Sequence, residues 1–354
     1  MNDLFEPLAT REGAELRFTP LSVCGDRWAA FAESVEGASL YHRAPWLELL
    51  RRAHGIDIHV ATLESGSDTL AGCLFARSAR PFARRLISLP DSEVCKPLAR
   101  TRDARNALLE ALAIHPDTRE GFEIHGVDAP PRPWQTVNVF GQWNINMQRS
   151  VEALHKALDR DVRRNMRHAL EAGIAIERGA SLEYLRRFYT LHLDTRRRLG
   201  MPPRPFRYFK LLHEIFSASG ALSVWIARQR GVDLAGLVML RDGDTLHAKM
   251  NARSPGCPNG ANHLMFVSAM DEFAGGVSNW DLGRVDSRNR GLTDFKKRLG
   301  ATSTPLPYAY LPQVPRNVSS EVLSGPAQLV SRAWRRLPIW TTRVLGMVVY
   351  GFLV

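Results

Sequence analysis

Residues 222–251 read LSVWIARQRGVDLAGLVMLRDGDTLHAKMN. Three runs of strand-forming residues in this stretch are separated by two short turn sequences, Arg230-Gly231 and Asp242-Gly243. The runs are Leu222 to Ala227, Asp233 to Leu240 and Thr245 to Asn251. Because short turns that contain glycine join neighbouring antiparallel strands, the stretch predicts a three-stranded β-meander.

Helices are predicted on both sides of this meander. Two amphipathic patterns precede it, Val151 to Ala172 and Ser181 to Leu199, and each is followed by a glycine, which commonly ends a helix. A loop rich in proline and glycine follows the meander and leads into a helix, a strand and a further helix. These segments are the loop Arg253 to Gly260, the helix Asn262 to Phe273, the strand Asn279 to Leu282 and the helix Leu292 to Leu299.

The first half of the chain repeats this order. A helical pattern over Asp26 to Val35 and a second one from Pro45 precede a β-hairpin over Ile58 to Phe75. The later segments are a strand over Leu86 to Leu89, a helix over Arg102 to Ile114 and short strands near Phe122 and Val137. The repetition predicts two copies of one mixed fold, which places the chain in the α/β class in its mixed α+β form.

The length of 354 residues also favours two domains, since one hydrophobic core seldom organises a chain of this size. We expect a first domain over residues 1–150, a second over residues 151–312 and a helical tail over residues 313–354. The composition, 45% hydrophobic and 23% charged, is typical of a globular protein rather than a disordered one.

The chain is strongly basic, and arginine supplies most of the charge. Only six of the 47 basic residues are lysines, and the formal net charge is +11. A surplus of this size favours polyanionic partners such as nucleic acid, nucleotides or an anionic membrane. An ordinary solvated surface accounts for it equally well, so charge alone does not decide between these interpretations.

Several functional classes are not indicated. The four cysteines form no metal-ligand or redox spacing, and His192, His247 and His263 have no partner at metal-ligand spacing, so no metal is predicted. No GxSxG sequence marks a serine nucleophile. The first 18 residues lack the apolar core of a secretory signal, and no run reaches the ~18 apolar residues of a membrane span, so we expect a cytoplasmic protein.

Four stretches in the second half resemble the FemAB family. They are DVRRNMRHALEAGI (Asp161 to Ile174), TRRRLGMPP (Thr195 to Pro203), PNGANHLMFVSAMDEF (Pro258 to Phe273) and WDLGRVDSRNRGLTDFKKRLGA (Trp280 to Ala301). The first half is similar only around Tyr41 to Leu50 and Leu89 to Leu98. The sequence WRRLPIWTTRVLG (Trp334 to Gly346) also resembles the ends of FemAB-like proteins associated with exosortase and exopolysaccharide systems.

This resemblance implies two tandem GNAT-like domains that transfer an acyl or aminoacyl group to an amine. It implies no tightly bound cofactor and a donor that is either acyl-CoA or aminoacyl-tRNA. The acceptor is expected to be an amine-bearing glycan or peptidoglycan precursor of the cell envelope. In the family, the lysine of an FK pair is implicated in stabilising the transition state, so Lys296, which follows Phe295, is the expected catalytic residue. Spacing alone instead favours the interpretation that Lys296, its neighbour Lys297 or both solvate one face of a short helix, and the resemblance reverses that preference.

Further candidates come from the chemistry of an anionic donor. A glycine-containing loop before a helix exposes backbone N–H groups to an anion, and Arg253, Gly256, Gly260 and Asn262 fit such a donor site. The loop departs from the QxxGxG/A pattern of acetyl-CoA-binding GNAT enzymes, and an ordinary loop with a helix cap remains an alternative. Arg284 and Arg288 are expected to bind a phosphate or carboxylate of the substrate. Phe295 and Lys297 are further expected substrate-binding residues, and Lys297 is the alternative to Lys296. Asp281, Asp286 and Asp294 are nearby acids, and no general base is assigned among them.

The tail combines apolar and aromatic residues with arginines. This pattern is typical of a helix on a membrane surface, here the inner membrane, although packing against the body of the protein explains it equally well. Two other functions remain open from the sequence. They are a non-catalytic GNAT-fold binding protein of a membrane-side polysaccharide assembly, and a tRNA-binding protein without transfer activity.

Overall fold

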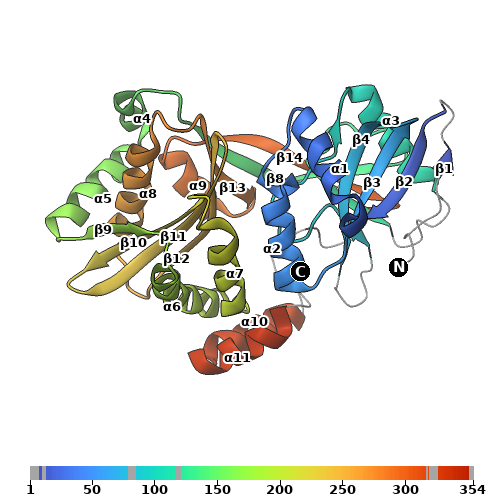
Figure 1. Ribbon diagram of the computed structural model, residues 1–354. Coiled ribbons are helices and arrows are strands. Elements are labelled where there is room, and N and C mark those ends of the chain that lie inside the picture. Colours follow the sequence, from blue (N-terminus) through green and yellow to red (C-terminus); the bar gives the residue numbers. More distant parts are fainter. Residues whose placement is uncertain are drawn as a thin grey trace. The chain divides into compact units, whose positions relative to one another are not determined.

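The structure is a computed structural model that describes residues 8–9, 13–78, 85–115, 121–315, 318 and 326–350 (Figure 1). The chain forms two compact units. The first unit extends to Val139 and also includes the segment Pro305–Val318. The second unit is Phe140–Thr304 together with the C-terminal helices as far as Tyr350.

The first unit is built on a mixed sheet with the strand order β1-β2-β3-β4-β5-β7-β14, and β6 pairs with β4. Its strands are β1 Leu8–Ala9, β2 Glu15–Pro20, β3 Ile58–Ser65, β4 Asp68–Arg77, β5 Leu86–Ile87, β6 Leu98–Ala99, β7 Phe122–His125 and β14 Thr302–Leu311, which enters this unit at Pro305. Strands β2, β3 and β4 form an antiparallel meander, whereas β5 and β7 are parallel. The predicted hairpin over Ile58 to Phe75 is therefore confirmed as β3 and β4.

Three helices and one 3₁₀ turn belong to the first unit: α1 Leu21–Ser34, η1 Leu40–His42, α2 Ala44–His54 and α3 Arg102–Ile114. Their ends follow from local chemistry. Pro45 stands in the first turn of α2, where its missing N–H costs nothing, and Gly55 ends the helix in the left-handed conformation with φ +66°. The Thr101 hydroxyl accepts a hydrogen bond from the Ala104 N–H and caps α3.

The second unit has the strand order β8-β13-β12-β11-β10-β9. Its strands are β8 Gln135–Asn146, which enters this unit at Phe140, and β9 Ala175–Gly179, β10 Leu222–Gln229, β11 Val232–Asp242, β12 Thr245–Arg253 and β13 Asn279–Asp286. Its helices are α4 Val151–Ala157, α5 Arg160–Glu171, α6 Leu182–Leu199, α7 Phe206–Phe216, α8 Asn259–Phe273, α9 Arg290–Arg298, α10 Pro326–Arg336 and α11 Ile339–Val349. The three-stranded meander predicted from residues 222–251 is confirmed as β10, β11 and β12.

Alternation along β11 explains how helices cover both faces of this sheet. Ala235, Leu237 and Met239 belong to a buried core that also contains residues of α5 and α8. Gly236, between them, faces the other way, since a Cβ there would touch Phe188 of α6. Helices α5 and α8 therefore cover one face, and α6 and α7 cover the other (Figure 1).

The long helix predicted over Val151 to Ala172 is two helices, α4 and α5. The break lies at Leu158 and Asp159, where the Asp159 carboxylate accepts a hydrogen bond from the Asp161 N–H and caps α5. The Asp159 N–H donates to the Arg298 carbonyl instead of continuing α4. Asp159 is therefore a second N-cap, which divides the predicted helix in two, and an amphipathic pattern alone does not reveal it.

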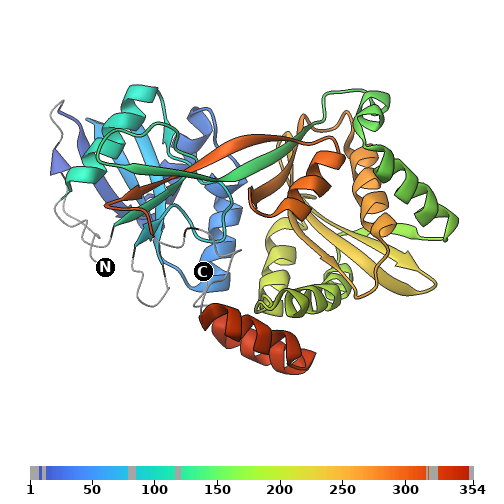
Figure 2. The same ribbon diagram turned by 180° about the vertical axis from the view of Figure 1, so that it is seen from behind.

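The two units share one order of elements: a strand, two helices, consecutive antiparallel strands, a helix and closing strands. The consecutive antiparallel strands are β3 and β4 in the first unit and β10 to β12 in the second. This order confirms a mixed α/β fold present in two copies. Each unit is completed by a strand from the other half of the chain, because β8 pairs with β13 in the second unit and β14 pairs with β7 in the first (Figure 2). The domain boundaries predicted at residues 150 and 312 divide the chain into consecutive segments. They therefore do not include this exchange of strands between the two halves of the chain.

Candidate functional site

The two parallel strands β12 and β13 part from each other within the second unit. Their parallel pairing covers Thr245 with Asn279, Leu246 with Trp280 and His247 with Asp281. Beyond that last pair, β12 continues along β11 as far as Arg253, and β13 continues along β8 as far as Asp286. In the part of the chain that the structure describes, β12 and β13 show no pairing past His247, and an extended ligand could pair with the separated strand edges as an added strand does.

A β-bulge lies on each side of this opening. In β12, Met250 pairs with Val238 and Ala248 pairs with Met239, so Lys249 is the additional residue. In β13, Leu282 and Gly283 together oppose Trp143. Gly283 has a φ of +79°, which a residue with a side chain rarely adopts. Bulges bend a strand and redirect its side chains, and they are over-represented beside active sites.

A buried histidine and aspartate pair joins the two strands where they part. His247 Nδ1 lies 3.0 Å from a carboxylate oxygen of Asp281, and the other oxygen accepts a hydrogen bond of 2.8 Å from the Gly283 N–H. Burial raises the pKa of Asp281, but the bonds from His247 and Gly283, together with the nearby Lys249, outweigh it and leave the pKa lowered. Asp281 is therefore a charged acceptor that fixes the imidazole and the bulge.

The sequence identifies Asp281 only as a nearby acid and gives His247 no partner at metal-ligand spacing. Their partnership was missed because 34 residues separate them along the chain. The register of the parallel strands β12 and β13 places His247 directly opposite Asp281. That register exists only in the folded sheet, so the sequence does not reveal the contact between the two residues.

Lys296 reaches the β13 bulge from helix α9. Its side chain is buried, with 6% of the residue surface exposed, and its Nζ donates hydrogen bonds of 2.6 Å to the Leu282 carbonyl and 2.9 Å to the Gly283 carbonyl. The neighbouring Lys297 is exposed. The interpretation that Lys296 only solvates a helix face is therefore wrong, whereas it fits Lys297.

Phe295, the other member of the FK pair, holds α9 against α8. Its ring stacks on His263 at a centroid distance of 5.4 Å and meets Phe266 edge-on at 5.2 Å. Burial, with a smaller contribution from Arg298, lowers the pKa of His263, so this histidine is neutral at neutral pH. Phe295 thus acts in packing and positions the backbone next to Lys296.

Two of the four predicted donor-site residues have structural partners within the second unit. A Cβ on Gly260 would overlap the Asn165 carbonyl and touch Ala169, so glycine at this position lets α8 cross α5 closely. Asn262 and Asn251 exchange side-chain amide hydrogen bonds of 3.0 and 3.2 Å, which tie α8 to β12. Gly260 thus serves helix packing, and the Asn262 side chain is engaged by Asn251.

Arg253 and Gly256 occupy the turn between β12 and α8. The Arg253 backbone forms hydrogen bonds with the Thr195 hydroxyl at 2.9 and 3.0 Å, and its side chain is exposed. Gly256 has a φ of +74° in open space. Pro258, the N-cap residue of α8, has no side chain that could accept a hydrogen bond from the first N–H groups of the helix. These N–H groups and the helix dipole therefore favour an anion at the N-terminus of α8.

The two predicted substrate arginines differ in their surroundings. Arg288 binds both carboxylate oxygens of the buried Asp286, with Nε and a terminal nitrogen at 2.9 and 2.6 Å. This pair secures the turn between β13 and α9. The Arg284 guanidinium lies over the Phe140 ring at 4.7 Å from its centroid. Arg288 is thus engaged within the protein, which argues against its predicted role in substrate binding.

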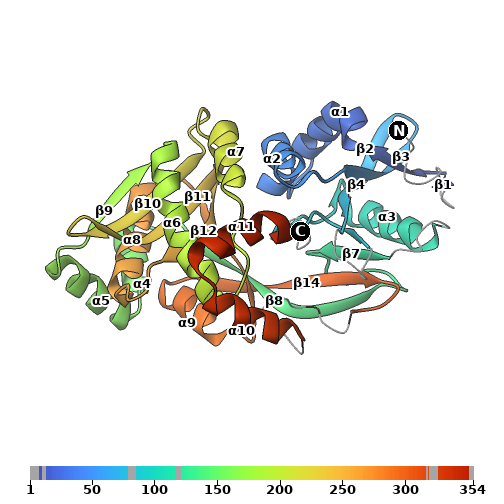
Figure 3. The same ribbon diagram turned by 90° about the horizontal axis from the view of Figure 1, so that it is seen from below.

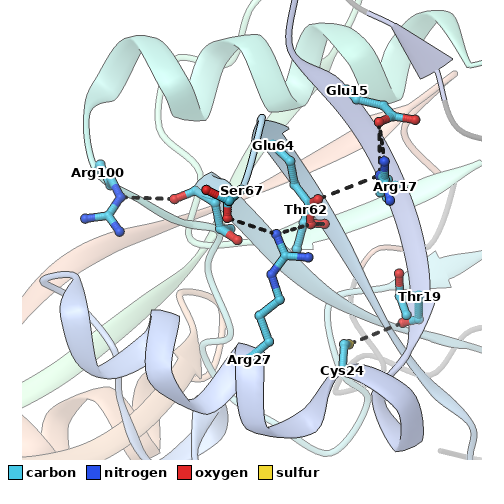
Figure 4. A network of polar contacts seen from close by, with 10 residues as sticks. Glu15, Arg17, Thr19, Cys24, Arg27, Thr62, Glu64, Ser67 and Arg100 are labelled. Carbon is cyan, nitrogen blue, oxygen red and sulfur yellow. Dashed lines mark hydrogen bonds and ion pairs between the residues drawn. The ribbon is translucent and has the colours of Figure 1, made fainter.

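The first unit contains a cavity of about 1050 Å³ between α1 and α2. Apolar side chains line it together with charged ones, among them Arg51, Asp57 and Arg77. A smaller cavity of about 430 Å³ lies beside the buried carboxylate of Glu64, which pairs with Arg27 at 3.0 Å and accepts a hydrogen bond from Thr62 at 2.8 Å (Figure 4). Both cavities are lined entirely by residues of this unit.

Among the described residues, no group of three or more His, Cys, Asp or Glu side chains is arranged to hold a metal ion. Within the same described ranges, no helix is both long enough and apolar enough to cross a bilayer.

Comparisons with known proteins agree with this geometry. Residues 156–297 match the family model of the acetyltransferase (GNAT) domain, and these residues span α5 to α9 and both bulges. No curated protein matches the sequence.

Three solved structures have a similar fold. FemX is 14% identical, with a TM-score of 0.60 over 80% of this chain and 95% of FemX. The C-terminal domain of an Agrobacterium fabrum protein assigned as a lysylphosphatidylglycerol synthetase is 12% identical, with a TM-score of 0.54 over 94% and 98% of the two chains. A tandem GNAT protein of the clavulanic acid biosynthesis pathway is 12% identical, with a TM-score of 0.52 over 83% and 98%.

Proposed function

We propose that the chain, whose residues 156–297 match the GNAT acetyltransferase domain and whose fold is similar to FemX and to a tandem GNAT protein, is a FemAB-like acyltransferase. It transfers an acyl or aminoacyl group to an amine of a cell-envelope or exopolysaccharide precursor. The second unit is proposed to carry the donor and the reaction, and the first to contribute to recognition of the acceptor. The observation that carries this proposal is the Lys296 ammonium held on the β13 bulge beside the opening between β12 and β13.

The proposed reaction is attack of a neutral amine on the donor carbonyl. Negative charge develops on the carbonyl oxygen as the bond to nitrogen forms, and a positive group fixed in a water-poor site stabilises it most effectively. We assign this role to Lys296, whose hydrogen bonds to Leu282 and Gly283 hold the charge in place without neutralising it. The leaving oxygen or sulfur departs with its electron pair and takes up the proton that the amine nitrogen loses, so the step balances without a side chain as base. Asp281 is a poor base, since its pKa is lowered.

The donor is proposed to bind along the opening, with its anionic part at the turn Arg253 to Pro258. Three features support this assignment. The edge of β12 past His247 can pair with an extended arm, the α8 N-terminus favours negative charge, and the Arg253 side chain is exposed beside it. GNAT domains use acyl-CoA as a co-substrate, and both acyl-CoA and aminoacyl-tRNA carry phosphates that suit this turn.

The acceptor is proposed to be an amine-bearing glycan or peptidoglycan precursor presented at the cytoplasmic face of the inner membrane. The similarity of Trp334 to Gly346 to FemAB-like proteins of exopolysaccharide systems supports this location. The mixed apolar and charged lining of the cavity between α1 and α2 suits a polar acceptor with an apolar part.

The decisive experiment offers acetyl-CoA, longer acyl-CoAs and charged tRNA separately to a panel of amines and amino sugars, with mass spectrometric detection of the product. We expect one donor class to give an amide product with the wild-type protein. Lys296→Met should lose it, and Lys297→Met, the matched exposed neighbour, should keep it. No product from any donor with folded wild-type protein would contradict the proposed function, and equal activity of both variants would contradict the assignment of Lys296.

A further inference from the structure

Helix α11 exposes large apolar residues and buries small or polar ones, the reverse of an ordinary surface helix. In α11, Thr342, Gly346 and Tyr350 lie on the buried side. On the opposite side, Trp340, Val344 and Met347 are 70%, 50% and 55% exposed. Their spacing of four and three residues places these three side chains in one stripe along the helix, which we call the α11 stripe.

Close contacts with the second unit fix which side of the helices faces outward. A Cβ on Gly346 would lie 2.8 Å from Pro203, so only glycine lets α11 lie this near to the chain after α6. Gly200, at the end of α6, leaves no room for a Cβ against Ser331 of α10. Figure 3 shows α10 and α11 lying against α6. Packing on the body is therefore observed, and it directs the α11 stripe away from the body.

The two C-terminal helices that carry the α11 stripe are strongly basic. Residues 326–350 contain four arginines and no acidic residue. The arginines, Arg332, Arg335, Arg336 and Arg343, are all exposed. Arg343 lies within α11 itself, one residue before Val344. A patch of this kind is complementary to a surface that is apolar inside and anionic outside.

We propose that α10 and α11 dock the protein on the surface of an anionic lipid bilayer. The α11 stripe inserts among the acyl chains near the headgroups, where tryptophan is favoured, and the four arginines bind lipid phosphates. A helix of 11 residues is too short to span a bilayer, so it lies in the plane of the surface. The inference deepens the membrane-side location proposed above, and its test measures binding rather than transfer, so the two can fail separately.

The experiment compares the full chain on vesicles of phosphatidylcholine alone and on an equal mixture of phosphatidylcholine and phosphatidylglycerol. We expect co-sedimentation only with the anionic vesicles, and binding that weakens as salt is added. The double variant Trp340→Ser, Val344→Ser should weaken binding by at least about tenfold. The matched control Val232→Ser, at an apolar residue 59% exposed elsewhere on the second unit, should bind as the wild type does.

A second readout tests whether the stripe itself enters the lipid. Brominated acyl chains should quench tryptophan fluorescence of the wild type more than that of Trp340→Phe, which keeps an apolar ring but removes the indole. Equal binding to both vesicle types, or unchanged binding of the double variant, would overturn the proposal. Self-association in solution that the double variant abolishes, without vesicle binding, would instead assign the stripe to a protein interface.

Discussion

The Nζ atom of Lys296 lies 2.6 Å from the carbonyl oxygen of Leu282, inside the bulge of β13. A lysine buried on two backbone carbonyls holds its charge at a fixed point, whereas an exposed lysine samples many positions. The geometry therefore separates Lys296 from Lys297, which the sequence presents as equivalent neighbours.

Lys296→Met should lower kcat by about 100-fold or more with little change in KM for the donor, since removing one fixed oxyanion-stabilising group has an effect of this size. Lys296→Arg should recover part of kcat, because it restores the charge but not the fit to the two carbonyls. Steady-state kinetics of purified variants measure both quantities. A rise in KM at constant kcat would assign Lys296 to donor binding instead of the reaction.

Much of the fold could be predicted, because the apolar alternation of strands and the apolar spacing of helices can each be recognised within a short stretch of sequence. The meander β10 to β12 and helix α3 lie where turns and apolar spacing put them. Helix α7, Phe206–Phe216, was missed since it follows a run of prolines that reads as a loop. The strand exchange could not be predicted either, because β14 pairs with β7, which lies far before it in the chain.

The site was predictable in part. The resemblance identified Lys296 and Phe295, and the structure gives both defined contacts. Gly260 was assigned to donor binding because a glycine before a helix suits an anion, but its backbone neighbour on α5 explains the residue fully. A sequence does not reveal which helix will cross another, so a packing glycine and a ligand-binding glycine look alike.

Gly260→Ala should therefore destabilise the second unit. Its new Cβ would overlap the Asn165 carbonyl, a backbone atom that cannot move aside without displacing α5, so a loss of about 1–3 kcal/mol in the free energy of unfolding is expected. Gly291→Ala is the matched control: it lies in α9 in open space, and alanine there should stabilise by about 0.5 kcal/mol. Urea unfolding measures both, and equal stability of the two variants would exclude the close crossing of α5 and α8.

The buried His247–Asp281 pair should show strong energetic coupling. A double-mutant cycle with His247→Gln and Asp281→Asn is expected to give about 1–3 kcal/mol in the free energy of unfolding, because each single change leaves a buried polar partner behind. The second unit offers a matched exposed pair, His155 and Asp271, at 2.6 Å with 41% and 43% of their side chains exposed. That pair should couple by about 0.5 kcal/mol or less. Similar coupling in both cycles would mean that the buried pair does not hold β12 to β13.

His42 should make the first unit sensitive to acid. Burial lowers the pKa of His42 from 6.5 to about 4, and its ring is held neutral between the Lys96 carbonyl at 2.9 Å and the Ser39 N–H at 3.1 Å. Between these two pH values the unfolded chain binds a proton that the folded chain does not, so the free energy of unfolding falls as the pH falls from 6.5 towards 4. The shift corresponds to about 3 kcal/mol.

Urea unfolding of the wild type and His42→Gln at a series of pH values measures this dependence. Gln keeps a donor for the Lys96 carbonyl but cannot titrate, so the variant should be less stable at pH 7 and should lose less stability between pH 6.5 and 4. The difference between the two proteins should therefore shrink as the pH falls, because acid removes the contribution of His42 from the wild type alone. Parallel pH profiles would show that His42 is protonated in the folded state as readily as in the unfolded one, which is incompatible with its burial beside Lys96 and Ser39.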